Sequence, residues 1–243
     1  MKIKTIIATV SAVLVVGAML TIASCASHQP KTEPCAWLKV EITDSLEHRF
    51  VETTELRDLI YRSGLSPAGK AMDDIDCHDI EECVLNHEMI RNAVCFKSPR
   101  GGVYLRVTQR VPILRVVTTT GSYYVDNNRT IMPNRSSIRV EVPTFKGDIG
   151  ERAAVEEYAD FALWLTNHSY WQPRIKHIQV YNPKHLVLAQ NDDMGNIILG
   201  ELTNYESKLN KLHKLYTKGF DKIGYKSYRE YDLRYDNQVV GRE

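Results

Sequence analysis

The feature that most constrains this chain of 243 residues is a single apolar segment near its start, from Thr5 to Ala26. With no charge and a length of about twenty residues, the segment fits one helical span of the hydrocarbon core of a membrane. Lys2 and Lys4 precede it, so the positive-inside rule leaves the N-terminus in the cytoplasm and the remaining chain across the membrane. The sequence therefore predicts a cytoplasmic N-terminus at 1–4, a transmembrane anchor at 5–26 and a linker at 27–36.

The end of the apolar segment allows a second interpretation. Ile22 to Cys25 (Ile-Ala-Ser-Cys) resembles a bacterial lipobox, in which the cysteine is acylated after cleavage. A basic start and a small-residue cleavage site also fit a signal peptide. The uncleaved anchor is favoured because the segment is long for the apolar region of a signal peptide. Both interpretations place the folded part outside the cytoplasm.

The charges of the chain nearly cancel, with 31 Lys and Arg against 30 Asp and Glu and a formal net charge of +1. No broad basic surface is therefore expected, and nucleic acid is excluded as a partner. The row of Lys208, Lys211, Lys214 and Lys218 on the last predicted helix is interpreted as a solvated face opposite a leucine stripe. A basic surface for anionic lipid is the less favoured alternative.

The cysteines are Cys25, Cys35, Cys77, Cys83 and Cys95. If Cys25 is in the membrane or lipidated, four remain in an oxidising compartment. Four cysteines allow three pairings, among which the sequence does not choose. A bond between Cys77 and Cys83 is disfavoured, because two residues six apart on one helix point in different directions.

Periodic apolar residues divide the rest of the chain into two units of α+β type. The first has the order strand, helix, helix, strand, strand, with elements expected at Trp37–Ile42, Thr53–Ser63, behind Asp79, at Ala93–Phe96 and at Val103–Val107. Val111-Pro112 marks a joint, which gives domains at 37–110 and 111–243. The second, larger unit is a mixed α/β-sheet domain. It is expected to contain strands at 113–118, 122–125 and near 131, breaks at Pro143 and Gly147, a helix at 152–167, strands at 177–181, 186–190 and 196–202, a helix from 203 or 204 to about 217, and a final strand at 231–240.

No pattern in the sequence carries a catalytic mechanism. A Gly-x-Ser-x-Gly motif, a P-loop and a dinucleotide fingerprint are all absent from it. The best metal candidates are Cys77, His78, Cys83 and His87, of which Cys83 and His87 share one helix face. A buried thiol beside a surface imidazole is preferred, because paired Cys-x-x-Cys motifs are missing and extracytoplasmic thiols tend to oxidise. We expect no catalytic residue, no metal, no cofactor and no small-molecule substrate.

In the order and spacing of its motifs the chain resembles the FtsQ/DivIB family of bacterial cell-division proteins, whose first unit is a POTRA domain. The matching stretches cover nearly the whole chain: Phe50–Leu56, Ile75–Leu85, Ile90–Ala93, Gln109–Arg115, Tyr123–Asp126, Ile131–Pro133, Ile198–Glu201, Lys208–Leu212 and Tyr231–Tyr235. Two local departures are Glu88, where the family often has proline, and Arg129, where a glycine often ends a turn.

The resemblance implies a non-enzymatic, membrane-anchored scaffold of the divisome, in the cell inner membrane with its C-terminal domains in the periplasm. Family members bind FtsB and FtsL, and through them regulate septal peptidoglycan synthesis. The family pairs its final strand with FtsB, which carries over to Tyr235, Asn237, Gln238, Val239 and Gly241 as the partner-binding residues. Alternating residues on an end strand also suit strand addition. The alternative is that Tyr235 and Val239 merely cover the sheet.

Two functions of other classes remain open at this point. One is a periplasmic lipoprotein that uses a POTRA-like domain in envelope assembly. The other is a hydrolase with an unrecognised triad. The chemical form of the mature N-terminus distinguishes the lipoprotein from the anchored scaffold. Activity on peptidoglycan or esters would identify the hydrolase.

Overall fold

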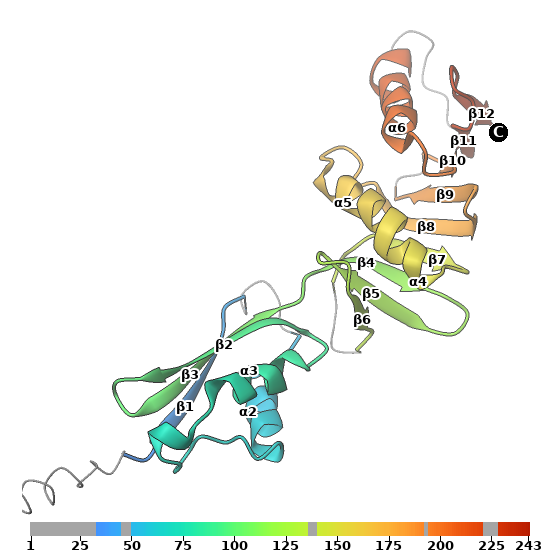
Figure 1. Cartoon of the computed structure of the whole chain (residues 1–243). Coiled ribbons are helices and arrows are strands. Elements are labelled where there is room, and N and C mark those ends of the chain that lie inside the picture. The colour runs from blue at the N-terminus through green and yellow to red at the C-terminus, as the bar shows by residue number, and fades with distance from the viewer. Residues whose placement is uncertain (1–32, 45–49, 136–139, 192–193, 221–227) are drawn as a thin grey trace, which may run out of the picture.

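The computed structural model describes residues 33–44, 50–135, 140–191, 194–220 and 228–243, which form two α+β units lying end to end (Figure 1). Within these ranges no helix is both long enough and apolar enough to cross a bilayer. The anchor predicted at 5–26 lies outside the described residues.

The smaller unit has the predicted βααββ order. Its elements are β1 (Trp37–Ile42), α2 (Thr53–Arg62), α3 (Cys77–Leu85), β2 (Ile90–Ser98) and β3 (Gly102–Gln109), with a short 3₁₀ turn at Met72–Asp74. The sheet order is β1-β3-β2, in which β1 runs parallel and β2 antiparallel to β3. Both helices pack on this sheet through fully buried residues at helical spacing, namely Leu56, Ile60, Ile80 and Val84.

Helix α3 begins at Cys77, before the predicted start at Asp79. The reason is the cap: the side chain of Asp76 accepts a hydrogen bond of 2.8 Å from the backbone N–H of His78. An aspartate at this position satisfies one of the unpaired N–H groups of the first turn. Asp79 therefore lies inside the first turn rather than in front of it.

The larger unit is a nine-stranded mixed sheet with helices on one face (Figure 1). Its strands are β4 (Pro112–Val117), β5 (Ser122–Asp126), β6 (Ile131–Pro133), β7 (Thr144–Gly147), β8 (Ile175–Asn182), β9 (His185–Gln190), β10 (Asn196–Gly200), β11 (Glu230–Asp232) and β12 (Val240–Arg242). Its helices are α4 (Glu151–Ala153), which continues through a π-turn (Ala154–Tyr158) into α5 (Ala159–Asn167), and α6 (Tyr205–Lys214), which ends in a π-turn (Leu215–Gly219). The strand order is β12-β11-β10-β9-β8-β7-β4-β5-β6.

Strand β7 corrects the prediction that the chain is merely broken at Pro143 and Gly147. The four residues between β4 and β8 run parallel to both strands and bury Phe145 completely. Inside the core this ring stacks on Tyr158 at 5.3 Å between centroids. A strand so short has no alternating pattern of its own, so only the tertiary position of Phe145 identifies it.

The last predicted strand, 231–240, is also corrected. The structure forms two short antiparallel strands, β11 and β12, separated by residues 233–239. Asp236-Asn237 form a turn, and both residue types favour turns through side-chain bonds to nearby backbone. The apolar residues Tyr231, Leu233 and Tyr235 alternate as they would in a strand, which is why the sequence predicts one continuous strand here.

Arg129 occupies the left-handed conformation, with φ of +65°, at the turn between β5 and β6. This backbone favours glycine, which is the residue that the family often has here. The Arg129 guanidinium donates to the carbonyls of Val155 and Glu156 at 3.1 Å each, and pairs with Asp160. These bonds across to the helical layer offset the strain of the turn.

Candidate protein-interaction edge

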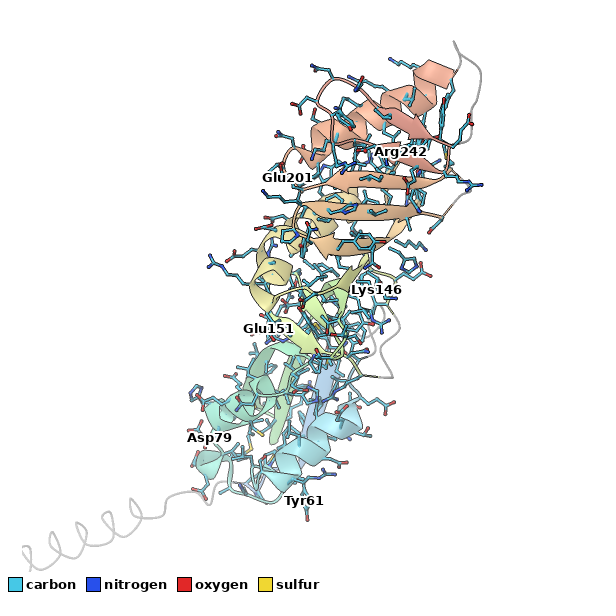
Figure 2. All side chains as sticks on the ribbon, turned by 90° about the vertical axis from the view of Figure 1, so that its right-hand side faces the viewer. Tyr61, Asp79, Lys146, Glu151, Glu201 and Arg242 are labelled. Atoms are coloured by element: carbon cyan, nitrogen blue, oxygen red, sulfur yellow. The ribbon has the colours of Figure 1, made fainter. Side chains whose placement is uncertain are left out.

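Strand β12 lies at one end of the nine-stranded sheet, and among the described residues only β11 pairs with it. Figure 2 shows Arg242 of this strand at the end of the molecule remote from Tyr61 and Asp79 of the smaller unit. The opposite edge strand, β6, contains Pro133, which lacks an N–H, and its Met132 packs into the core of the smaller unit. The β12 edge is thus the better suited of the two to accept another strand.

The open side of β12 is identified by one backbone bond. The carbonyl of Arg242 accepts from the N–H of Arg229 at 2.9 Å, which turns the Arg242 peptide group toward β11. Backbone groups of successive residues in a strand point to alternate sides. Gly241 therefore directs its N–H and C=O to the open side of the sheet.

Glycine suits this position because the strand lies directly on an aromatic ring. A Cβ atom on Gly241 would lie 2.8 Å from three ring atoms of Tyr228. Tyr228 in turn packs edge-on against the fully buried Tyr231, with centroids 5.7 Å apart. The edge is therefore seated on the core of the domain rather than projecting from it.

A buried carboxylate holds the two strands and their loop together. Asp232 of β11 accepts from the Arg234 side chain at 2.9 Å (Nε) and 2.6 Å (Nη2), and from Arg242 Nη2 at 3.0 Å. The side chain of Asp232 is fully buried, whereas both arginines keep nearly half of their side-chain surface in solvent. The hydrogen bonds from Arg234 and the charges of both arginines hold the pKa of Asp232 below its usual value.

Two lysines of α6 anchor the neighbouring backbone. Lys211 donates its ammonium group to the carbonyls of Tyr235, at 2.9 Å, and Asp236. Lys208 donates to the carbonyls of Leu199 and Glu201, at 3.2 and 2.8 Å, and burial lowers its pKa. Two residues of the lysine row that was predicted to be a solvated face therefore bind backbone: Lys211 fixes the loop before β12, and Lys208 fixes the end of β10.

The five predicted site residues occupy different environments in this hairpin. Tyr235 is exposed at 46 %, Asn237 and Gln238 are exposed in the loop, and Gly241 lies in β12. Val239 is partly buried against the core of the larger unit, as the alternative interpretation of it required. The sequence did not single out Asp232, Arg234, Arg242 or Tyr228, which shape the edge.

The joint between the two units is a second polar site. Gln109, fully buried at the end of β3, accepts from the N–H groups of Phe50 and Val51 at 2.9 and 3.0 Å. The next residue, Arg110, pairs at 2.8 Å with Asp126 of the larger unit, whose side chain is also fully buried. The motif at 109–115 thus marks the joint through its polar side chains as well as its proline.

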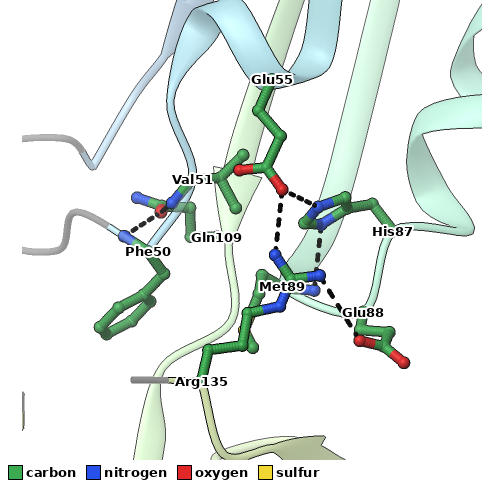
Figure 3. Close-up of polar contacts among 8 residues, drawn as sticks. All are labelled: Phe50, Val51, Glu55, His87, Glu88, Met89, Gln109 and Arg135. Atoms are coloured by element: carbon green, nitrogen blue, oxygen red, sulfur yellow. Dashed lines mark hydrogen bonds and ion pairs between the residues drawn. The ribbon is translucent and has the colours of Figure 1, made fainter. Parts of the chain in front are cut away.

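A charged cluster crosses the same joint, as Figure 3 shows. Arg135 of the larger unit pairs with Glu55 of α2 at 3.0 Å and with Glu88 at 3.6 Å. His87 Nε2 lies 3.1 Å from the same Glu55 oxygen, and its Nδ1 accepts from the N–H of Met89 at 3.3 Å. Burial acts to raise the pKa of Glu55, but the bonds from His87 and Arg135 outweigh it and hold that pKa below its usual value.

Three of the candidate metal ligands, Cys83, His87 and His78, form hydrogen bonds or ion pairs with other side chains. The Cys83 thiol donates to the Ser63 hydroxyl at 3.2 Å, whereas His87 contacts Glu55. His78 is paired with Glu82 at 3.3 Å on the outer face of α3. Across the described ranges, no group of three His, Cys, Asp or Glu side chains is placed to hold a metal ion.

The structure is that of a two-domain α+β protein, with a small βααββ unit joined to a large mixed sheet. Comparison with family models matches residues 33–108 to the POTRA-like domain and residues 111–242 to the FtsQ/DivIB C-terminal related domain. Because the second match covers more than half of the chain, the protein belongs to the FtsQ/DivIB family. A comparison with curated proteins found no match. The family is one of non-enzymatic cell-division scaffolds, so a role in cell division and divisome proteins as partners are supported.

Proposed function

We propose that this protein is a single-pass divisome scaffold of the inner membrane whose β12 edge receives a strand from an FtsB-like partner. An FtsL-like protein joins the complex through that partner, and the assembly helps to regulate septal peptidoglycan synthesis. The folded domains lie in the periplasm. The observation that carries the proposal is the open side of β12, where the N–H and C=O of Gly241 are available for pairing.

Strand addition divides the recognition between backbone and side chains. β12 is short, so the backbone contributes few bonds and the flanking loop must supply contact area. Tyr235 is the largest exposed apolar side chain of that loop, and its position is fixed by Lys211. A rigid aromatic residue beside a paired edge is the type of residue that dominates many interfaces.

The proposal is tested by affinity purification of the tagged full-length chain from dividing cells. Crosslinked membrane complexes should contain FtsB-like and FtsL-like proteins, and Tyr235→Ala should deplete both. A central aromatic anchor is worth about 2 kcal/mol, or roughly thirtyfold in affinity. Tyr61→Ala is the matched control, because Tyr61 is exposed at 75 % on α2, far from the edge. Equal recovery of both partners by the parent and Tyr235→Ala would place the interface elsewhere.

The mode of anchoring has its own test. Mass spectrometry of the mature protein should show a chain that retains the segment 5–26. Diacylated Cys25 at a new N-terminus would instead identify a lipoprotein and would favour the envelope-assembly alternative.

A further inference from the structure

We propose that Cys77 and Cys95 form a disulfide when the chain meets an oxidising environment. The side chains of these two residues are hydrogen-bonded to each other in the smaller unit. The other two cysteines of the described residues direct their thiols elsewhere, Cys35 to the Trp37 carbonyl at 3.3 Å and Cys83 to the Ser63 hydroxyl at 3.2 Å. Of the pairings that the sequence left open, the structure therefore selects this one.

A second contact independently sets Cys77 opposite β2. Glu81 lies one turn after Cys77 on α3, so the two side chains share one helix face. The Glu81 carboxylate accepts a bond of 2.6 Å from the backbone N–H of Cys95. The face of α3 that carries Cys77 is thus held against the part of β2 that carries Cys95.

The two thiols differ in access, which sets the order of reaction. Cys95 is buried, and burial together with the bond from Cys77 raises its pKa well above the usual range. Cys77 is partly exposed at the first residue of α3. A thiolate is the reacting species in disulfide exchange. An incoming disulfide therefore meets Cys77 first, and Cys95 completes the bond.

The reaction needs an oxidant, which is the disulfide of an external thiol compound or a thiol–disulfide oxidoreductase. The Cys77 thiolate attacks one sulfur of that disulfide and forms a mixed disulfide, releasing one thiol of the oxidant. Cys95 then loses its proton and attacks the Cys77 sulfur, which releases the second thiol. The cysteine pair loses two electrons and two protons, and the oxidant gains them.

The bond would stiffen the part of the smaller unit that faces the joint. The loop that it closes, from Cys77 to Cys95, contains His87 and Glu88, which form the charged cluster with Glu55 and Arg135. Cross-linking removes conformations of the unfolded chain. For a loop and a domain of this size, the thermal transition of the smaller unit is expected to rise by about 10 °C.

The test uses the reduced full-length chain in detergent, equilibrated with oxidised glutathione, after which remaining thiols are alkylated. Trypsin alone leaves Cys77 and Cys83 on one peptide, 71–91, so a second cleavage after Glu81 or Glu82 is needed to separate them. Mass spectrometry without reduction should then show Cys77 linked to Cys95 and Cys35 and Cys83 alkylated. The oxidised chain should also melt about 10 °C above the reduced one.

Variants complete the design. Cys77→Ser should abolish both the link and the shift in melting temperature, whereas Cys83→Ser should keep both. Alkylation of Cys35, Cys77, Cys83 and Cys95 in the folded parent, or a link from Cys95 to Cys35 or Cys83, would overturn the proposal. The parent measurement needs no substitution, so its outcome holds even where a variant folds poorly. Partner binding plays no part in this measurement. The disulfide proposal therefore fails or succeeds independently of the proposed scaffold function.

Discussion

Replacing Asp232 by Asn should weaken the C-terminal hairpin without changing its shape. Asn has the same outline as Asp and keeps one side-chain oxygen as an acceptor. It loses the negative charge that three side-chain bonds from Arg234 and Arg242 satisfy. The variant therefore isolates the electrostatic contribution of the network from the packing of β11.

The magnitude follows from burial and exposure. A hydrogen bond to a charged group contributes about 1.5–3 kcal/mol when both partners are withdrawn from water. Here the carboxylate is buried, but the two arginines are 43 % and 47 % exposed and recover part of the loss through hydration. We expect a destabilisation of about 2 kcal/mol, which lowers the melting temperature of the larger unit by roughly 6 °C.

The pH dependence provides a second readout. The folded-state pKa of Asp232 is lowered, so its contribution is present above the unfolded pKa of about 3.9 and is lost as the pH falls through the folded value. The difference in unfolding free energy between parent and variant should be constant from about pH 5 to pH 8 and shrink below about pH 4.

Urea denaturation followed by circular dichroism measures both the loss in unfolding free energy and its dependence on pH. Glu141→Gln is the matched control, because it removes an exposed ion pair of 2.8 Å with Lys176 and should change little. If Asp232→Asn is as stable as the parent at pH 7, or if the difference persists unchanged at pH 3, the buried charge of Asp232 does not stabilise the hairpin.

Two further predictions concern the smaller unit and the joint. Arg135→Ala removes the ion pairs with Glu55 and Glu88 and should lower the free energy of unfolding by at most about 1 kcal/mol in low salt. In 1 M NaCl this difference should disappear. Urea titrations that show the same loss of stability at both salt concentrations would contradict an ionic joint. Gly102→Ala places a Cβ about 2.2 Å from the Trp37 ring. The variant should destabilise the smaller unit by about 1–3 kcal/mol and alter its tryptophan fluorescence. A melting temperature and an emission spectrum like those of the parent would show that the ring moves freely.

Long elements with a clear period could be predicted from the sequence. The βααββ order and the helix at 152–167 agree with the structure to within a few residues, because each buries an apolar face on its own pattern. The start of α3 and strand β7 could not be placed well. The first depends on one side-chain cap at Asp76, and the second depends on the two neighbouring strands, β4 and β8, between which Phe145 is placed.

The sequence predicted a sheet edge at the C-terminal end but not the form of that edge. The sequence placed the partner edge at the C-terminal end, and the structure has a sheet edge there in β12. The turn at Asp236-Asn237 divides the expected strand, so Tyr235 lies in the loop and Gly241 on the edge. The network around Asp232 joins residues two and ten positions apart, and an alternating pattern gives no signal of such pairs.

The central claim is that the open side of β12 pairs with a partner strand, and Gly241 permits a sharp test. Gly241→Ala and Gly241→Pro both bring a Cβ against Tyr228, but only proline removes the outward N–H. The alanine variant therefore controls for the steric effect. Circular dichroism and melting temperature should be alike for the two variants.

The measurement is isothermal titration calorimetry of the full-length chain in detergent with the purified FtsB-like protein. We predict that Gly241→Ala binds and that Gly241→Pro binds at least tenfold more weakly, since a lost interfacial bond and the accompanying displacement exceed about 1.4 kcal/mol. Equal affinities for the two folded variants would contradict strand pairing at this edge.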